Sequence, residues 1–313
     1  MVASRRYIEN VLATLDRAAD ANRHTPGRQG GTVVLACSPR APHEAGEQAN
    51  LLDAADVPPD EVMITGDVHG HRRNFNRIRR IAALADHPYR HLVLQEVCHG
   101  GPSYAAGGCM SHTMLEDVAS LVARHPGRVH FILGNHELAE MSDYPIQKNR
   151  QLLNVQFRLG LRHMYGPASE EVRLAYVRFL WTCPLAVRLP SGIFVSHSLP
   201  EGTDGQGFEP SVLLRELRRE DCVEQADVFR LLWGRDYRRE NAQAFMELVG
   251  ARLLITGHEP CSEGFVVPND AQVILDCCGP RAAYAILPVA AELSQSQIIE
   301  RIGILDDTQA GSP

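Results

Sequence analysis

The sequence predicts an α/β protein. From residue 61 onward, short apolar runs rich in Val and Ile alternate with segments whose apolar residues recur at helical spacing. Strands that alternate with helices are typical of the α/β class. In addition, five of the apolar runs are followed directly by a polar cluster, and ligand chemistry in α/β folds lies at the carboxyl ends of strands.

The first 60 residues have a different pattern. Apolar residues at helical spacing predict an amphipathic helix over 4–19, and a short apolar run over 32–37 predicts a strand. Residues 38–60 contain four prolines and predict a long connection with at most one helical turn. We therefore expect a helical extension and linker over 1–60 and a single domain over 61–313.

The remaining elements follow in chain order. Runs of four to six apolar residues predict buried strands at 61–65, 91–94, 128–133, 192–196, 252–256, 272–276 and 283–287. Helical spacing predicts helices at 172–180, 211–232 and 240–249, the last of them ending at Gly250.

Composition narrows the class of protein. Hydrophobic residues make up 44% and charged residues 22%, as in ordinary globular proteins. The formal net charge of −7 argues against an extended nucleic-acid surface. We find neither a signal-peptide pattern nor an apolar run long enough to span a bilayer, and we expect a cytoplasmic protein without a membrane partner. The eight cysteines show no C-x-x-C spacing, so we expect reduced thiols rather than a zinc ribbon.

The polar clusters after the strands carry the candidate chemistry. Their sequences are GDVHG, QEVCHGG, GNHE, SHS and TGHE. They contribute the candidate ligands Asp67, His69, Glu96, Asn135, His197 and His258, and also His99 and His136.

Carboxylate, amide and imidazole ligands without thiolates suit Mn, Fe or Zn. Two such ions a few ångströms apart can hold a phosphoryl group between them and activate water. A carboxylate shared by both ions would offset their repulsion. Each motif alone is weak, but five of them in order, each after an apolar run, predict a two-metal site.

GDVHG, GNHE, His197 and Gly257–His258 resemble the calcineurin-like metallophosphoesterases, and within them the phosphoprotein phosphatase group, which includes bacterial serine/threonine and diadenosine-tetraphosphate enzymes. LLWGRD at 231–236 is similar to a segment of the bacterial members. The resemblance covers about residues 61–290 and implies a two-sheet β-sandwich flanked by helices. It also implies hydrolysis of a phosphorylated substrate, protein or nucleotide, by a metal-bridging hydroxide.

The resemblance assigns a role to each matching residue. Two metal ions would be held by Asp67, His69, Glu96, Asn135, His197 and His258, with Glu96 between them. His136 would protonate the leaving oxygen, since a histidine near neutral pKa can supply that proton. Arg235 would hold the phosphate, because a guanidinium binds phosphate oxygens in pairs.

The second motif departs from the family pattern GD-x-x-DRG. Glu96 replaces the bridging Asp, His99 replaces an Asp that orients the histidine of the third motif, and Gly100 replaces a phosphate-binding Arg. Arg72 and His99 are the candidates to bind phosphate instead. Three alternatives stay open: an active phosphatase, a catalytically silent metal-binding relative, and a phosphodiesterase on the same scaffold. The sequence does not determine the oligomeric state.

Overall fold

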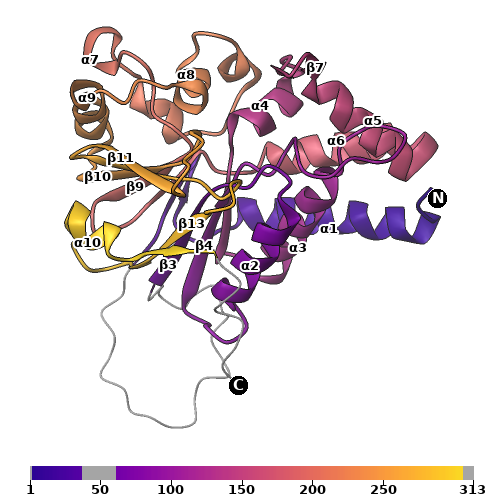
Figure 1. The fold of residues 1–313 in the computed structure, drawn as a ribbon, viewed down its shortest axis with the longest axis horizontal. Coiled ribbons are helices and arrows are strands. Elements are labelled where there is room, and N and C mark those ends of the chain that lie inside the picture. Colours follow the sequence, from indigo (N-terminus) through magenta and orange to yellow (C-terminus); the bar gives the residue numbers. More distant parts are fainter. Residues whose placement is uncertain (1, 37–60, 306–313) are drawn as a thin grey trace.

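Two β-sheets form the centre of the protein, and helices cover their outer faces (Figure 1). The structure is a computed structural model that describes residues 2–36 and 61–305. This arrangement confirms the predicted α/β class and the two-sheet sandwich.

The larger sheet has seven strands in the order β1-β2-β8-β9-β10-β12-β11. β9 and β12 both pair in parallel with β10, so their carboxyl ends lie at one edge of the sheet. The strands are β1 (Arg28–Gln29), β2 (Thr32–Val34), β8 (Ala186–Arg188), β9 (Ile193–Ser196), β10 (Leu253–Thr256), β11 (Phe265–Asn269) and β12 (Gln272–Leu275).

The smaller sheet has five strands in the order β14-β13-β3-β4-β5. β3, β4 and β5 run parallel, and a bridge between Asp67 and Asp276 joins the end of β3 to the residue after β12. The two sheets therefore meet at the edge where their parallel strands end. The strands are β3 (Glu61–Asp67), β4 (Arg90–Gln95), β5 (Val129–Ile132), β13 (Ala283–Pro288) and β14 (Ile302–Ile304).

Successive side chains along a strand face alternately the apolar layer between the two sheets and the apolar layer under the helices. Val62 and Ile64 of β3 lie in the apolar layer between the sheets, whereas Met63 lies in the layer beneath the helices. β9 does the same, with Val195 between the sheets and Phe194 on the helix side. Both faces of these strands are buried, which explains why their sequences are continuous apolar runs.

The described residues contain ten α-helices. They are α1 (Arg5–Arg23), α2 (Arg72–Ala82), α3 (His112–Arg124), α4 (Asn135–Ser142), α5 (Leu153–Tyr165), α6 (Ser169–Leu180), α7 (Thr203–Gln206), α8 (Asp227–Trp233), α9 (Arg239–Val249) and α10 (Gln295–Ile299). Phe245 of α9 meets Phe194 of the larger sheet edge-on at 5.8 Å between ring centroids. None of these helices combines the length and the apolar character that a bilayer span requires.

The N-terminal segment is built into the same layers. α1 packs against α3 and α6, and the side-chain amide of Asn22 donates to the hydroxyl of Thr182 at 3.1 Å. β2 pairs in parallel with β8 and so extends the larger sheet. The predicted connection over 38–60 lies outside the described residues.

Most predicted elements are confirmed, and one is wrong. The predicted helix over 211–232 is replaced by two 3₁₀ turns, Pro210–Leu213 and Arg219–Cys222, and the short α8. The Asp221 carboxylate accepts hydrogen bonds from the Arg215 guanidinium and from the backbone N–H of Arg218, and this local bonding competes with a continuous helix. Gln225, with φ of 72°, separates the turns from α8.

Candidate metal centre

A cavity of about 260 Å³ opens where the parallel strands of both sheets end. Asp67 ends β3 and His69 follows it, Glu96 follows β4, and Asn135 and His136 begin α4 after β5. His197 follows β9 and His258 follows β10. The cavity lining includes Asp67, His69, Glu96, Asn135, His136, Arg235 and His258. The structure thus brings together the candidate ligands from five separate loops.

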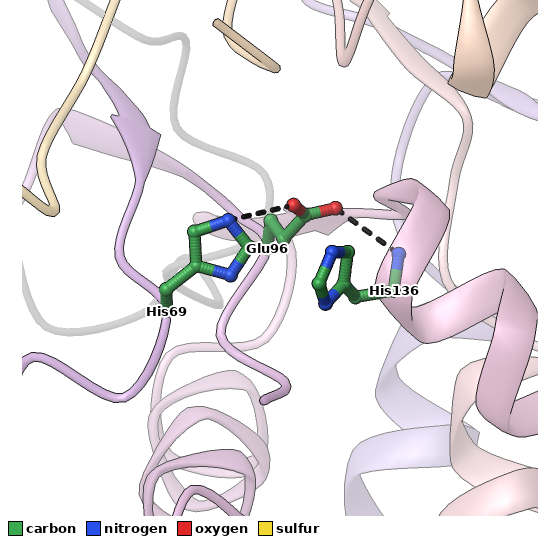
Figure 2. A group of neighbouring side chains, drawn as sticks. All are labelled: His69, Glu96 and His136. Atoms are coloured by element: carbon green, nitrogen blue, oxygen red, sulfur yellow. Dashed lines mark hydrogen bonds and ion pairs between the residues drawn. The ribbon is translucent and has the colours of Figure 1, made fainter. Parts of the chain in front are cut away.

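Glu96 lies at the centre of the cluster. Its Oε1 is 3.1 Å from Nε2 of His69, and its Oε2 is 3.1 Å from Nε2 of His197. The backbone N–H of His136 donates to the same Oε2 at 3.2 Å, and Figure 2 shows His69, Glu96 and His136 facing one another. Both oxygens of this buried carboxylate therefore point at potential metal ligands.

Two groups of ligand atoms could each hold a metal ion, and Glu96 belongs to both. One group is His69, Glu96 and His136, and the other is Glu96, His197 and His258. Asp67 and Asn135 complete the surroundings. Oδ1 of Asn135 lies 2.9 Å from Nε2 of His197, and Oδ2 of Asp67 lies 3.8 Å from Nε2 of His69. This is the arrangement that a bridging carboxylate requires.

The backbone of these loops is strained in a way that supports a functional role. His69, Glu96 and His258 have φ values of 42°, 39° and 71°, a region that non-glycine residues seldom adopt. Such residues cluster at active sites, where the surrounding fold holds them in place. At Gly257 an added Cβ would lie 2.4 Å from Oδ1 of Asp67, so the chain must have glycine here for Asp67 to reach the site.

The charges of the cluster call for cations. Burial, followed by the negative charge of Glu96, raises the pKa of Asp67 well above its usual range. Burial also raises the pKa of Glu96, but the imidazoles around it, led by His197, hold that pKa well below its usual range. Two carboxylates buried this close together repel each other unless protons or metal ions compensate their charge.

The imidazoles are suited to bind metal in their neutral form. Burial lowers the pKa of His197 to about 4 and that of His258 well below its usual range. Burial lowers the pKa of His69, but Glu96, Asp67 and the backbone of Cys98 together raise it to about 9. A metal ion would compete with that proton, because imidazole ligates only when deprotonated.

Two details fit resident metal ions. Nδ1 of His258 lies 3.0 Å from Nε2 of His197, which is itself 3.1 Å from Oε2 of Glu96, so the two imidazole nitrogens converge beside this carboxylate oxygen. Nδ1 of His197 lies 3.0 Å from Oε1 of Gln95, whose own amide donates to the carbonyl of Thr65 at 2.7 Å. Gln95 thereby fixes the proton on Nδ1 of His197 and leaves Nε2 free for a metal.

A hydrogen-bonded chain runs behind His136. Nδ1 of His136 lies 2.8 Å from Nδ1 of His99, and Nε2 of His99 lies 2.7 Å from Oε1 of Glu140. The sequence had left the partner of His136 open, and Glu140 was not among its candidates. A signal was present, however, because Glu140 lies four residues after His136 and so shares its face of α4.

The three candidate phosphate-binding residues differ in their positions. Arg235 lines the cavity, and its guanidinium also contacts the carboxylate of Glu259. Arg72 does not line the cavity, since it is bound to Asp117 and Thr113 of α3. His99 is buried, and the chain behind His136 engages both of its ring nitrogens.

Several further residues at the cavity were not among the sequence candidates. Lys148 belongs to the hairpin of β6 (Gln147–Lys148) and β7 (Gln151–Leu152), and it lines the cavity together with Asp276 and Cys278. The Asp276 carboxylate accepts hydrogen bonds from the backbone N–H groups of Cys261 and Cys278, so it orients the turn after β12. No strand pattern leads into this hairpin, which explains why sequence reasoning missed it.

Comparisons with known proteins identify the family. The family model of calcineurin-like phosphoesterases matches residues 61–262. A protein serine/threonine phosphatase from Saccharomyces cerevisiae superposes with a TM-score of 0.64 at 14% identity, covering 95% of this chain and 88% of its own. A cold-active protein-tyrosine phosphatase from a psychrophilic Shewanella gives 0.50 at 11% identity, covering 79% and 81%.

At such low identities the structural matches establish the fold alone. A search of curated protein sequences gave no match. The family model spans well over half of the chain, and it contains every candidate ligand. The chain therefore belongs to the calcineurin-like phosphoesterase family.

Proposed function

We propose that this protein is a metal-dependent phosphatase that hydrolyses phosphate monoesters or phosphoanhydrides. The observation that carries the proposal is Glu96, a buried carboxylate whose two oxygens each lie 3.1 Å from a different imidazole, one oxygen from His69 and the other from His197. A structural ion pair would not need a shared carboxylate, imidazole nitrogens of His197 and His258 that converge beside it and an open cavity in one place.

The ligand set divides around Glu96. Asp67, His69 and Glu96 would hold one ion, while Glu96, Asn135, His197 and His258 would hold the other. Divalent ions such as Mn, Fe or Zn, when bound, would polarise the phosphoryl oxygens and lower the pKa of the attacking water.

The other residues of the cavity would serve the substrate. His136 would give a proton to the leaving oxygen, a role that typically contributes about 10²–10⁴-fold to the rate. Arg235 would bind the non-bridging phosphate oxygens with the guanidinium nitrogens that Glu259 leaves free.

A groove next to the cavity could hold the part of the substrate that carries the phosphate. A groove of about 1060 Å³ adjoins the cavity and shares Trp233 and Arg235 with it. Trp233 stacks on Phe229 with ring centroids 5.3 Å apart, so the groove offers an aromatic wall. Both a nucleoside and a peptide side chain could pack there. The proposal therefore covers dinucleoside polyphosphates and phosphoproteins.

Hydrolysis of p-nitrophenyl phosphate by the Mn-loaded protein tests the proposal, with Asp67→Asn as the inactive variant. We expect turnover that a chelator abolishes, that added Mn restores, and that Asp67→Asn lacks. Hydrolysis of the diester bis(p-nitrophenyl) phosphate is measured in parallel, and a preference for this diester would favour the phosphodiesterase alternative. A protein that binds two ions yet hydrolyses neither ester would be the silent relative, and the proposal would be wrong.

A further inference from the structure

The chain behind His136 has a defined hydrogen-bond direction. A carboxylate oxygen accepts, so Nε2 of His99 must donate to Glu140 across their 2.7 Å separation. When this is the only proton on the ring, the lone pair lies on Nδ1. Because that atom lies 2.8 Å from Nδ1 of His136, the proton between them belongs to His136.

His99 is held firmly enough to impose this direction. Its side chain is 1% exposed and Glu140 is 3% exposed, so water does not replace either hydrogen bond. The backbone of His99 has a φ of 65°, and its N–H donates to the hydroxyl of Ser111 at 3.0 Å. Phe157 packs edge-on against the ring at 5.8 Å, which restricts its rotation. A left-handed, buried imidazole with both nitrogens engaged is a costly arrangement to maintain without a function.

We propose that Glu140 and His99 are positioning residues that keep the proton of neutral His136 on Nδ1, so that Nε2 is the nitrogen that exchanges protons with the substrate. The proposal rests on the proposed phosphatase function. In one turnover a water oxygen bonds to phosphorus and the ester P–O bond breaks. Nε2 of the neutral ring first takes up a proton from solvent. The leaving oxygen then takes that proton, which returns His136 to its neutral form with Nδ1–H, and the proton released by the attacking water goes to solvent.

The tautomer of His136 can be measured without any activity. Long-range ¹H–¹⁵N correlation spectra of the metal-free protein distinguish the two nitrogens of each imidazole. We expect the Nδ1–H tautomer for His136 in the wild type and a mixture of tautomers in His99→Asn. A wild-type His136 that carries its proton on Nε2 would overturn the proposal even if the protein hydrolysed nothing.

Kinetics with leaving groups of different acidity test the consequence. We expect His99→Asn to slow phenyl phosphate about 10–100-fold, yet 2,4-dinitrophenyl phosphate less than about threefold, because only the poor leaving group needs a proton. In a His136→Asn background the same substitution should cost nothing further. Equal losses on both esters, or additive losses in the double variant, would indicate a merely structural role for His99.

His112→Asn is the matched control. His112 is also fully buried, also packs on Phe157 and also pairs with a carboxylate, Glu116, but it does not touch His136. Its substitution should change stability without changing the dependence on the leaving group. An inactive wild type would contradict the proposed function, whereas the tautomer measurement would still decide the role of His99.

A second, independent observation concerns Lys148. The sequence holds 31 basic residues, and Lys148 is the only lysine among them. The hairpin turn Asn149–Arg150 has φ values of 50° and 62°, the backbone of a tight two-residue hairpin that fixes where the preceding residue lies. This turn places Lys148 at the wall of the metal cavity.

Lys148 is also a cation without a counter-ion in the described part of the chain. No carboxylate of residues 2–36 or 61–305 forms an ion pair with it, whereas Arg235 contacts Glu259 and Arg72 contacts Asp117. The charge of Lys148 also acts on a neighbour in the cavity. Burial raises the pKa of the Cys278 thiol to about 12, and the positive charge of Lys148 works in the opposite direction. An ammonium group at the wall of this cavity would bind the negatively charged oxygens of a phosphate.

We propose that Lys148 binds the non-bridging oxygens of the substrate phosphate together with Arg235, which lines the same cavity. The ligand class is a phosphoryl group, and this proposal too depends on the cavity being the phosphate site. Since the ammonium group is a flexible point charge, we expect it to assist binding more than the chemical step.

The single lysine allows a direct test by acetylation and peptide mass spectrometry. Inorganic phosphate should slow acetylation of Lys148 in the Mn-loaded protein at least fivefold, and it should leave the N-terminal amine of the same chain unaffected. The inhibition constant of phosphate should rise about tenfold in Lys148→Met and stay unchanged in Arg150→Met, the control on the same turn. Acetylation unaffected by saturating phosphate would overturn the proposal, whether or not the protein turns over esters.

Discussion

Two sets of ionisable side chains lie toward opposite ends of the same two strands, β4 and β5, and they differ in their surroundings. His91 lies near the start of β4 and His130 lies within β5, and their rings stack with Nδ1 of His91 2.8 Å from Nε2 of His130. Glu96 follows the other end of β4, and His136 follows the other end of β5. In the part of the chain that the structure describes, the two rings of the first set bond to each other, whereas the second set lines the metal cavity.

The comparison shows that a side chain within a strand has a structural role here, whereas a side chain just after the strand end reaches the metal cavity. His91 and His130 sit in the regular ladder, where the backbone is ordinary β-strand and neither residue has positive φ. The site residues lie just beyond the ladder, where left-handed backbone at His69 and Glu96 turns side chains from separate loops toward one point. Predictions can therefore contrast the two sets directly.

Glu96→Gln should have the largest effect. The substitution keeps the shape but removes the charge that both ligand groups share, so at least one metal ion should be lost. We expect kcat/KM to fall about 10³-fold or more, the equivalent of several kcal/mol of lost transition-state stabilisation. Metal content by mass spectrometry and hydrolysis of p-nitrophenyl phosphate measure both consequences.

His130→Gln on the neighbouring strand should leave metal content and kcat/KM within about twofold of the wild type. An equal loss in both variants would mean that β4 and β5 transmit damage to the site regardless of position. The comparison of the two sets would then fail.

His136→Asn should have the next largest effect. The asparagine cannot deliver a proton, so kcat should fall about 10²–10⁴-fold while the metal content stays the same. His91→Asn is the control, and it should not change kcat. Loss of metal from His136→Asn would instead place His136 among the ligands, as its closeness to His69 and Glu96 also allows.

Gln95→Leu should have an intermediate effect. Gln95 ends β4, four residues beyond His91, and it holds Nδ1 of His197 at 3.0 Å. Removal of this hydrogen bond frees the ring to change tautomer, and such changes typically weaken metal affinity about 10–100-fold. Titration of the metal-free protein with Mn²⁺ measures the change, and His91→Gln should bind the metal like the wild type. Equal affinity in Gln95→Leu would mean that packing alone orients His197.

The sequence predicted what depends on local pattern. Short apolar runs identified β3, β4, β5, β9 and β10, and their carboxyl ends identified the residues that converge on the cavity. The family model over residues 61–262 confirms the family that GDVHG and GNHE resembled. A parallel sheet brings strand ends together, so this much follows from order and spacing.

Contacts between distant parts of the chain could not be predicted in this way. Arg72 was a candidate for phosphate because it follows GDVHGH, but Asp117 lies 45 positions away and engages it. Lys148 reaches the cavity from a hairpin whose residues carry no strand pattern. The helix expected over 211–232 failed because Asp221 bonds locally to Arg215 and Arg218, a competition that helical spacing alone does not reveal.

The smallest effect concerns stability rather than activity. Burial, and then the charge of Arg128, lowers the pKa of His91 to about 4, while burial lowers that of His130 well below its usual range. In the unfolded chain both would titrate near 6.5. The unfolded state therefore binds more protons below pH 6.5, and the stability that the neutral pair contributes is present above that pH and lost as the pH falls toward 4.

Urea unfolding of the wild type and His130→Gln between pH 4.5 and 8 measures this effect. Each imidazole can lower the free energy of unfolding by at most about 1.4 kcal/mol per pH unit, so the variant should lose stability less steeply below pH 6.5. The activity of the variant at pH 7 should be unchanged, because the pair lies away from the cavity. If the free energy of unfolding fell equally steeply with pH in both proteins, the histidines of the metal site, rather than His91 and His130, would set the sensitivity to acid. The prediction for this pair would then be wrong.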